Sequence, residues 1–332
     1  MSEQIELEDL ISKLESPADT LLLFHRSPDA DAVGSAFALR RMLTELGSRA
    51  WCVCANEIPA RLQFLTNGDQ DSVLPQCIPA DFQVQRIVAL DSASPAQLDS
   101  LFDLYGDRID LMIDHHQNGE PYAAYCYIRP DAAATAEILF DLVKALASEE
   151  RLTITDEICT DLYAAISGDT GCFRYSNVTP ETHMRAAALL ARGIDSAEIN
   201  HRLYDCQSMD RLRAQAAGIS NLNLFADGKI AVITFPYALK AALGLDDEHL
   251  DSLVDIARSL EGVQVAICIR QPGTEGRFRV SARSSCSYDV SALCAMFDGG
   301  GHAKAAGCTV VADDINDAMN KIVSAIDFSV AE

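Results

Sequence analysis

Acidic residues and histidines stand at the ends of three apolar runs that have the composition of buried strands. The runs are residues 20–24, 86–90 and 110–113. The acids and histidines at their ends are His25, Asp29, Asp31, Asp91, Asp114, His115 and His116. In open α/β sheets, ligands bind beyond the carboxyl ends of the strands. The three runs therefore predict a metal site at one edge of a sheet.

A fourth segment, which contains Asp169, belongs to the same predicted site. Asp169 follows a predicted helix, and Gly168 and Gly171 allow a tight turn that leaves its side chain free to reach the same site. Carboxylates and imidazoles without thiolates suit divalent ions such as Mn²⁺ or Mg²⁺. Crowded carboxylates repel one another unless cations neutralise them, and two ions that share a bridging carboxylate can clamp a phosphoryl group.

Each acidic segment taken alone has an ordinary explanation. Asp29 and Asp31 could form a solvated turn, and Asp91 could cap the helix that follows it. Four such segments at the ends of strands or helices are hard to explain in that way. We therefore expect a metal centre rather than four unrelated turns.

The composition narrows the class of substrate and partner. The chain has 332 residues, 49% of them hydrophobic, and a net charge of −23. Proteins bind long nucleic acids mainly through Lys and Arg contacts to phosphates. We therefore expect a small phosphate substrate and no binding of a long polymer. No apolar run has the roughly 20 residues that span a bilayer. The eleven cysteines form no CxxC pair and the first residues show no signal-peptide pattern, so we expect a cytoplasmic protein with reduced thiols.

The order of expected elements predicts an α/β fold in two domains. In the first half, strands (also 49–54) alternate with helices at 34–46, 135–147, 156–166 and 180–190, which is typical of a covered parallel sheet. Residues 25–31 are expected to form a loop. A connecting helix is expected at 197–218. The second half has expected strands at 229–235, 263–269 and 278–284 and helices at 246–260, 290–297 and 314–326.

These motifs, in this order, resemble the DHH phosphoesterase superfamily, and the C-terminal half is similar to its DHHA1 subfamily. The motifs are His25-x3-Asp29-x-Asp31, Asp91-Ser92-Ala93, Asp114-His115-His116, Gly168-Asp169-Thr170-Gly171 and Gly299-Gly300-Gly301-His302. The short arrangement is similar to the nanoRNase and pAp phosphatase branch, and no DHHA2 pattern is present. The resemblance implies a parallel-sheet DHH domain over 1–195, a connecting helix over 196–218 and a smaller DHHA1 domain with a mixed sheet over 219–332.

The resemblance also implies a role for each metal-site residue. It implies two divalent ions, Mn²⁺ first and Mg²⁺ or Co²⁺ as alternatives. One ion would be held by His25, Asp29 and Asp91. The other would be held by Asp31, Asp91, His115 and Asp169, with Asp91 as the bridge. Asp114 and His116 would be catalytic residues that orient ligands or face the phosphate.

In the C-terminal half, the resemblance implies a clamp for the substrate's terminal phosphate and base. Consecutive glycines let backbone N–H groups approach a phosphate closely. For Phe173, stacking on a base and packing beneath the site are equally compatible with the sequence. The expected substrate-binding residues are Phe173, Arg174, Arg279, Arg283, Ser284, Gly299, Gly300, Gly301 and His302.

The leading hypothesis is a hydrolase for short RNA, about two to five nucleotides long, that uses a hydroxide activated by two metal ions. It could also act on 3′-phosphoadenosine 5′-phosphate. The first alternative is a phosphodiesterase for cyclic di-AMP or linear pApA. The second is a nucleotide sensor without catalysis, against which the intact acidic motifs argue. A homodimer is compatible with the sequence.

Overall fold

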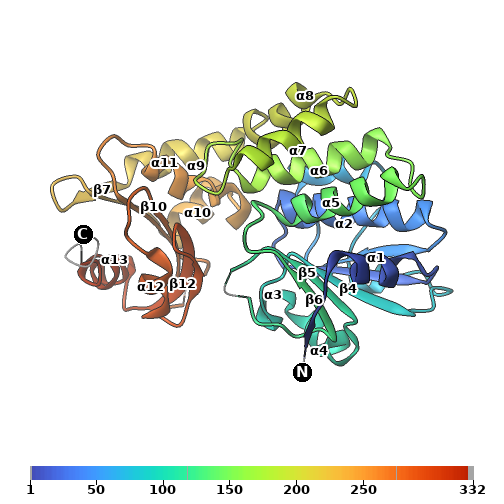
Figure 1. Cartoon of the computed structure of the whole chain (residues 1–332). Helices are drawn as coiled ribbons and strands as arrows, with labels where there is room; N and C mark the ends of the chain where they lie inside the picture. The colour runs from blue at the N-terminus through green and yellow to red at the C-terminus, as the bar shows by residue number, and fades with distance from the viewer. Residues whose placement is uncertain (1, 118, 274, 328–332) are drawn as a thin grey trace. The chain divides into compact units, whose positions relative to one another are not determined.

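The computed structural model describes residues 2–117, 119–273 and 275–327. It divides into two compact units, residues 1–206 and 207–332. The division falls inside the segment expected to connect two domains, whose exact boundaries stay a prediction. Both units are α/β, one with a parallel and one with a mixed sheet, so the predicted fold class is confirmed (Figure 1).

The N-terminal unit is built on a six-stranded sheet in which every pairing is parallel. The strands are β1 (Glu3–Gln4), β2 (Thr20–Phe24), β3 (Ala50–Val53), β4 (Arg86–Leu90), β5 (Leu111–Asp114) and β6 (Tyr125–Ile128). Their order is β1-β6-β5-β4-β2-β3. The chain leaves β2 toward β3 on one side and leaves β4 toward β5 on the other. The topological switch point, where ligands bind in such sheets, therefore lies between β2 and β4.

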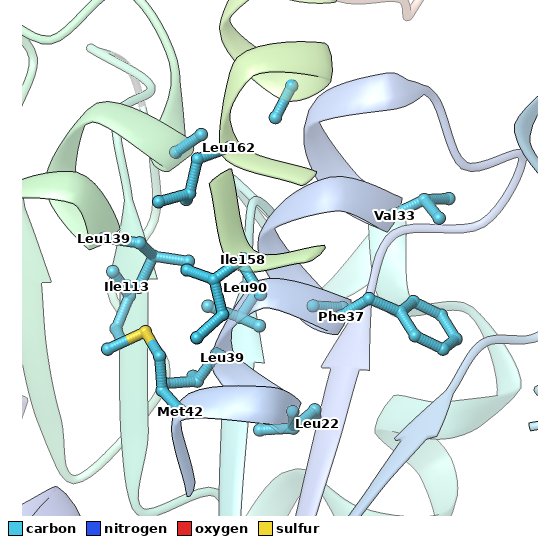
Figure 2. Packing of buried hydrophobic residues seen from close by; sticks show 14 of the residues in the cluster. Leu22, Val33, Phe37, Leu39, Met42, Leu90, Ile113, Leu139, Ile158 and Leu162 are labelled. Atoms are coloured by element: carbon cyan, nitrogen blue, oxygen red, sulfur yellow. The ribbon is translucent and has the colours of Figure 1, made fainter. Parts of the chain in front are cut away.

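Helices cover both faces of this sheet, which explains why β2 and β4 are apolar after their first residues, Thr20 and Arg86. Every residue of both strands is buried. Leu21 and Leu23 belong to a core with α3 (Pro95–Leu98) and α4 (Ser100–Tyr105). The opposite face packs on α1 (Leu7–Glu15), α2 (Ala30–Glu45), α5 (Thr135–Ser148), α6 (Asp156–Asp169) and α7 (Pro180–Leu190). Figure 2 shows Leu22, Leu90 and Ile113 of the sheet beside residues of α2, α5 and α6.

Two helix starts show how closely the sequence predicts local structure. Thr179 caps α7 and Pro180 is its first residue, as predicted. The expected loop over 25–31 is shorter than predicted, because α2 begins at Ala30 rather than at residue 34. Asp29 is its N-cap, and one carboxylate oxygen accepts hydrogen bonds from the N–H groups of Asp31 and Ala32, each 3.0 Å long. Asp31 therefore lies in the first turn of a helix.

Two glycines bring α2 and α6 into close contact. A Cβ on Gly34 would lie 2.6 Å from the carbonyl oxygen of Asp161 in α6. A Cβ on Gly168 would lie 2.6 Å from the Cβ of Ala30. The end of α6, with Asp169, is thereby held against the beginning of α2, with Asp31. This contact is the physical reason that a distant acid reaches the strand ends.

We expect Gly168→Ala to destabilise the N-terminal unit by about 1–3 kcal/mol, because the added methyl group overpacks the contact with Ala30. The chain has one tryptophan, Trp51 in β3, so its fluorescence during urea unfolding reports on this unit alone. Adding Ala30→Gly removes the opposing methyl group and is expected to recover part of the loss. A single variant as stable as the wild type would refute the role of this contact.

The C-terminal unit has a mixed sheet in the order β11-β12-β10-β9-β8-β7, in which β8 and β9 are parallel and the other neighbours antiparallel. The strands are β7 (Leu222–Phe225), β8 (Ile230–Phe235), β9 (Val265–Arg270), β10 (Arg277–Ser284), β11 (Gly300–His302) and β12 (Ala305–Val311). One face packs on α12 (Val290–Ala295) and α13 (Ile315–Ser324). The other packs on α9 (Met209–Ser220) and α11 (Leu253–Arg258).

Two helices expected to be continuous are interrupted. The connecting segment consists of α8 (Ser196–Asn200), a π-helical turn (His201–Asp205) and α9, with a break at residues 206–208. The helix expected over 246–260 is a 3-10 turn (Asp247–Leu250) followed by the short α11. Side chains cap the new starts: Ser208 accepts from the N–H of Arg211 and Asp246 caps the 3-10 turn. No helix in the described ranges has the length and apolar character needed to cross a membrane.

Candidate metal centre

The structure brings the predicted acids and histidines of the N-terminal unit together in overlapping groups of three. Within each group, one nitrogen or oxygen atom from every residue lies within 4.8 Å of the others. The groups are His25–Asp29–Asp91, Asp31–His115–Asp169 and Asp91–His115–His116. The first group is the ligand set that the family resemblance implied for one ion, and the second contains the set implied for the other ion except Asp91. Their role as metal ligands remains a prediction, and their proximity makes it testable.

Strand ends place the first of these residues. His25 and Asp91 directly follow β2 and β4, the two strands at the topological switch point. Asp91 has a left-handed backbone, with φ +50°, and its N–H donates to the carbonyl oxygen of Ile113 in β5 over 3.1 Å. Asp is among the few non-glycine residues that tolerate this conformation. The turn aims the Asp91 carboxylate along the sheet edge instead of into the following chain.

The backbone fixes the orientation of two imidazoles. Nδ1 of His25 lies 2.8 Å from the carbonyl oxygen of Arg26, and Nδ1 of His115 lies 3.2 Å from that of Ala132. A carbonyl oxygen only accepts hydrogen bonds, so Nδ1 carries the proton in both rings. The other nitrogen, Nε2, faces the carboxylates: 3.6 Å from Asp91 for His25 and 3.3 Å from Asp169 for His115. This is the orientation that metal-ligating histidines require.

The start of α5 binds the Asp31 carboxylate, and this contact was not predicted from the sequence. The Asp31 carboxylate accepts hydrogen bonds from the N–H groups of Thr135 (2.6 Å) and Ala136 (3.1 Å) and from the Ser35 hydroxyl (3.0 Å). The hydroxyl of Thr135 also donates to Asp91 over 3.1 Å. Thr135 thus ties together one carboxylate from each of the two predicted ligand sets. Its place at the first residue of a predicted helix was the available signal.

We expect Thr135→Val to weaken Mn²⁺ binding about tenfold, because outer residues that orient metal ligands have effects of this size. Valine keeps the shape and the backbone N–H but removes the hydroxyl bonded to Asp91. Thr135→Ser retains the hydroxyl and is the matched control, with affinity close to the wild type. Calorimetric titration of the metal-free protein with Mn²⁺ measures both. Equal affinities for the valine and serine variants would exclude this role.

The carboxylates resist ionising together. Burial raises the pKa of Asp31, and repulsion from Asp91 and Asp169 raises it further. Burial also raises the pKa of Asp91, with repulsion from Asp29. For Asp169, burial and the nearby acids outweigh the attraction of His115 and raise the pKa to about 7. Divalent cations would remove this repulsion, and oxygen and imidazole donors suit Mn²⁺. The residues present therefore fit a centre of divalent ions.

Asp114 and His116 form a second, tightly bonded pair beside these groups. One oxygen of Asp114 accepts hydrogen bonds from the backbone N–H (2.8 Å) and Nδ1 (2.6 Å) of His116. Burial opposes a charge on the imidazole, but the bond to Asp114 prevails and raises the pKa of His116 to about 9. Burial likewise opposes ionisation of Asp114, and the bond to His116 lowers its pKa below the usual range. The pair therefore presents a cationic imidazole at neutral pH.

Phe173 and Arg174 lie outside the three groups. The Phe173 ring stacks on His183 with centroids 5.5 Å apart and lies 5.9 Å from the ring of Tyr163. These contacts favour packing, the alternative to base stacking that the sequence left open. Arg174 is exposed, and its Nε donates to the carbonyl oxygen of Gly171 over 2.6 Å. Substrate contact by either residue stays a prediction.

The substrate-binding residues predicted in the C-terminal unit lie on β10 and on the edge strand β11, with Gly299 just before β11. Arg279 and Arg283 share one face of β10, while Ser284 is buried and its hydroxyl donates to the carbonyl oxygen of Cys286. The glycine run is partly regular structure: Gly300, Gly301 and His302 form β11. Gly299 is packed so tightly that a Cβ would lie 2.3 Å from the carbonyl oxygen of Gly307. Their contact with substrate stays a prediction.

Comparison with known proteins finds two family models that match this chain and several similar relatives. Residues 19–166 match the model of the DHH family, N-terminal domain, and residues 228–327 match that of the DHHA1 domain. The bifunctional oligoribonuclease and PAP phosphatase NrnA of Thermus thermophilus is 31% identical over 96% of this chain and 91% of its own length. The Bacillus subtilis protein of the same name is 23% identical over 89% of this chain and 91% of its own.

Two further matches are a relative about twice as long as this chain and a solved structure. The cyclic-di-AMP phosphodiesterase PdeA of Listeria monocytogenes is 23% identical over 97% of this chain but only 49% of its own length. Among solved structures, an exopolyphosphatase-related protein from Bacteroides fragilis superposes with a TM-score of 0.84 at 24% identity, covering 98% of this chain and 95% of that one. At this identity the superposition supports the fold alone.

Proposed function

This chain belongs to the DHH family of phosphoesterases, and on that premise we propose that it hydrolyses short oligoribonucleotides with the help of two divalent ions. That it is a hydrolase of phosphate esters, as the sequence predicted, is confirmed by its family and relatives. The observation that carries the proposal is the position of Asp91, which lies in one group with His25 and Asp29 and in another with His115, a member of the second proposed ligand set. The similarity to an oligoribonuclease and PAP phosphatase over nearly the whole chain supports the choice of substrate.

In the proposed centre, His25, Asp29 and Asp91 hold one ion. Asp31, Asp91, His115 and Asp169 hold the other. The bound ions supply Lewis acidity, which lowers the pKa of water and offsets the charge that develops on a phosphate during hydrolysis. Mn²⁺ is the proposed metal because imidazole and carboxylate donors are both present.

The chain's own residues prepare the site for this reaction. Thr135 and the start of α5 fix the Asp31 carboxylate before substrate arrives. Asp114 orients the His116 ring and keeps it protonated, so that a cationic N–H can face the phosphate. A fixed cation of this kind favours the more highly charged transition state. No cysteine is part of the three groups.

A second candidate substrate is a cyclic or linear dinucleotide. The similarity to a cyclic-di-AMP phosphodiesterase extends over 97% of this chain, which favours keeping this alternative. A metal centre of the same kind can hydrolyse either phosphodiester, so the centre itself does not rank the two substrates. Activity on 3′-phosphoadenosine 5′-phosphate is a further part of the proposal, supported by the names of two relatives that match this chain over about 90% of their own length.

The test compares Mn²⁺-dependent turnover of four substrates by the purified chain: an RNA pentanucleotide, pApA, 3′-phosphoadenosine 5′-phosphate and cyclic di-AMP. We expect the highest kcat/KM for pApA or the pentanucleotide. The control is Asp103→Asn, which changes an exposed acid outside the site and is expected to leave turnover unchanged. A kcat/KM highest for cyclic di-AMP, or turnover of pApA without turnover of the pentanucleotide, would replace the leading proposal by the second candidate. No turnover of any of the four would refute both.

A further inference from the structure

A cavity of about 500 Å³ lies within the C-terminal unit, and neither the metal centre nor the glycine segment contributes to it. Its volume falls within the range of small-ligand sites, roughly 300–1,000 Å³. Of the substrate-binding residues predicted from the sequence, Arg279 alone contributes to its lining. The residues that matter for its chemistry are Tyr237, Pro272, Glu275, Arg277, Arg279 and Thr309.

Strand alternation places the two arginines side by side in this cavity. Phe278 and Val280 of β10 point into the core and are buried, so Arg277 and Arg279 share the opposite, exposed face. Thr309 of β12 is paired directly with Arg279 across the antiparallel ladder. The buried residues fix the strand, and the strand fixes the spacing of the two guanidinium groups. A hydroxyl and two planar cations therefore converge on one surface.

The positive charge at this surface is poorly neutralised. Asp247 already binds the ammonium group of Lys240, and Arg279 approaches the same carboxylate only to 3.6 Å. Within the described ranges, Arg277 has no ion pair. Glu275 is the one acid of the lining. In a chain with a net charge of −23, adjacent guanidinium groups with spare charge indicate a site for an anion.

An aromatic wall stands next to the arginines and is held in place. Tyr237 begins α10 (Tyr237–Leu243), and its N–H donates to the side-chain oxygen of Gln271 over 3.1 Å. The ammonium group of buried Lys240 donates to the carbonyl oxygen of Pro272 over 2.8 Å and lies 5.7 Å from the centre of the Tyr237 ring. The ring and the loop at Pro272 are thus tied to the same lysine. A fixed ring beside cations suits a ligand that carries both a flat base and a phosphate.

We propose that this cavity binds a nucleoside phosphate, with the phosphate on Arg277, Arg279 and Thr309 and the base against Tyr237. The ligand has two potential sources. One is a free nucleotide, which would make the cavity a site beyond the proposed function. The other is the terminal nucleotide of an oligoribonucleotide substrate, and this source rests on the proposed function.

Binding of 5′-AMP to the full chain in EDTA, measured by calorimetry, tests the site itself, because EDTA removes the divalent ions that the metal centre needs. We expect Arg277→Gln/Arg279→Gln to weaken AMP binding at least tenfold, since charge-assisted hydrogen bonds are lost. Both side chains are exposed, so the fold is expected to persist. Tyr237→Ala, which changes no charge, is expected to weaken binding by a similar factor. Arg213→Gln, an exposed arginine of α9, is the matched control and is expected to bind like the wild type.

The proposal fails if the double variant binds AMP as tightly as the wild type, or if adenosine binds as tightly as AMP. With Mn²⁺ present, a higher KM for the RNA pentanucleotide in the double variant assigns the cavity to the substrate. An unchanged KM together with lost AMP binding assigns it to a free nucleotide. A wild type that binds AMP but cleaves no RNA would overturn the proposed function and leave the cavity's assignment standing.

Discussion

Asp91→Asn is expected to lower kcat for phosphodiester hydrolysis about a thousandfold or more. Asp91 is the proposed bridge, because it groups with His25 and Asp29 of one ligand set and with His115 of the other, so its loss is expected to affect both predicted ions. The amide nitrogen of asparagine cannot ligate a cation, and the substitution removes one negative charge. A thousandfold loss corresponds to about 4 kcal/mol, within what metal ions contribute to such reactions. The measurement is steady-state turnover at saturating Mn²⁺, with Mn²⁺ affinity measured in parallel.

Asparagine is the informative replacement because of the backbone at this position. Asp91 has φ +50°, and asparagine adopts the left-handed region nearly as readily as aspartate. The native turn is therefore expected to survive, so that lost activity is not lost folding. Trp51 fluorescence during urea unfolding checks this directly. A variant with wild-type kcat would contradict the account in which Asp91 bridges two ions.

Asp169→Asn is expected to change stability and activity in opposite directions. In the metal-free protein at pH 8 we expect the variant to be more stable than the wild type by about 1–2 kcal/mol, or a few degrees in Tm. The reason is that burial and the neighbouring acids raise the pKa of Asp169 to about 7, so its ionised form is disfavoured in the folded state. Hydrolysis is expected to fall at least a hundredfold, because a proposed metal ligand is lost.

The pH dependence of this difference follows from the raised pKa. A carboxyl whose pKa is higher in the folded state contributes stability below its ordinary value near 4, and that contribution is lost as the pH rises through about 7. The metal-free wild type should therefore lose stability relative to Asp169→Asn between these values, and the two should converge near pH 4. With Mn²⁺ the order should reverse, because the wild type gains more binding energy. Thermal unfolding followed through Trp51 measures the Tm of both proteins, with and without Mn²⁺, between pH 4 and pH 8. Identical dependence of Tm on pH in the two metal-free proteins would count against the electrostatic argument.

The sequence predicted that these acids and histidines lie close together, because most of them stand at strand ends. The carboxyl ends of parallel strands meet at one edge, so the apolar runs before His25, Asp91 and His115 are enough to predict that these residues meet. Asp169 was harder to place. Its position depends on Gly168 and Gly34, where two helices touch, and a contact between helices leaves no periodic signal in the sequence.

Other features of the structure could not be predicted, because they depend on contacts between distant residues or on weak sequence patterns. Thr135 reads as an ordinary first residue of a helix, yet its hydroxyl and N–H bind acids that are 44 and 104 positions away in the chain. The strand β6 was missed because it is only four residues long, and β12 because small residues and Thr309 interrupt its apolar pattern. In the segment 246–260, where one helix was expected, the structure has a 3-10 turn followed by the short α11, and both contribute residues to the same core as β9.

Counting the divalent ions bound by the chain, while turnover is followed, tests the central claim most directly. The metal-free protein is titrated with Mn²⁺, and free ion is measured by electron paramagnetic resonance alongside pApA hydrolysis. The account predicts two bound ions per chain and turnover that appears only as they bind. In Asp91→Asn it predicts neither the binding of two ions nor this turnover. Full turnover by the metal-free protein, or two tightly bound ions retained in Asp91→Asn, would contradict it.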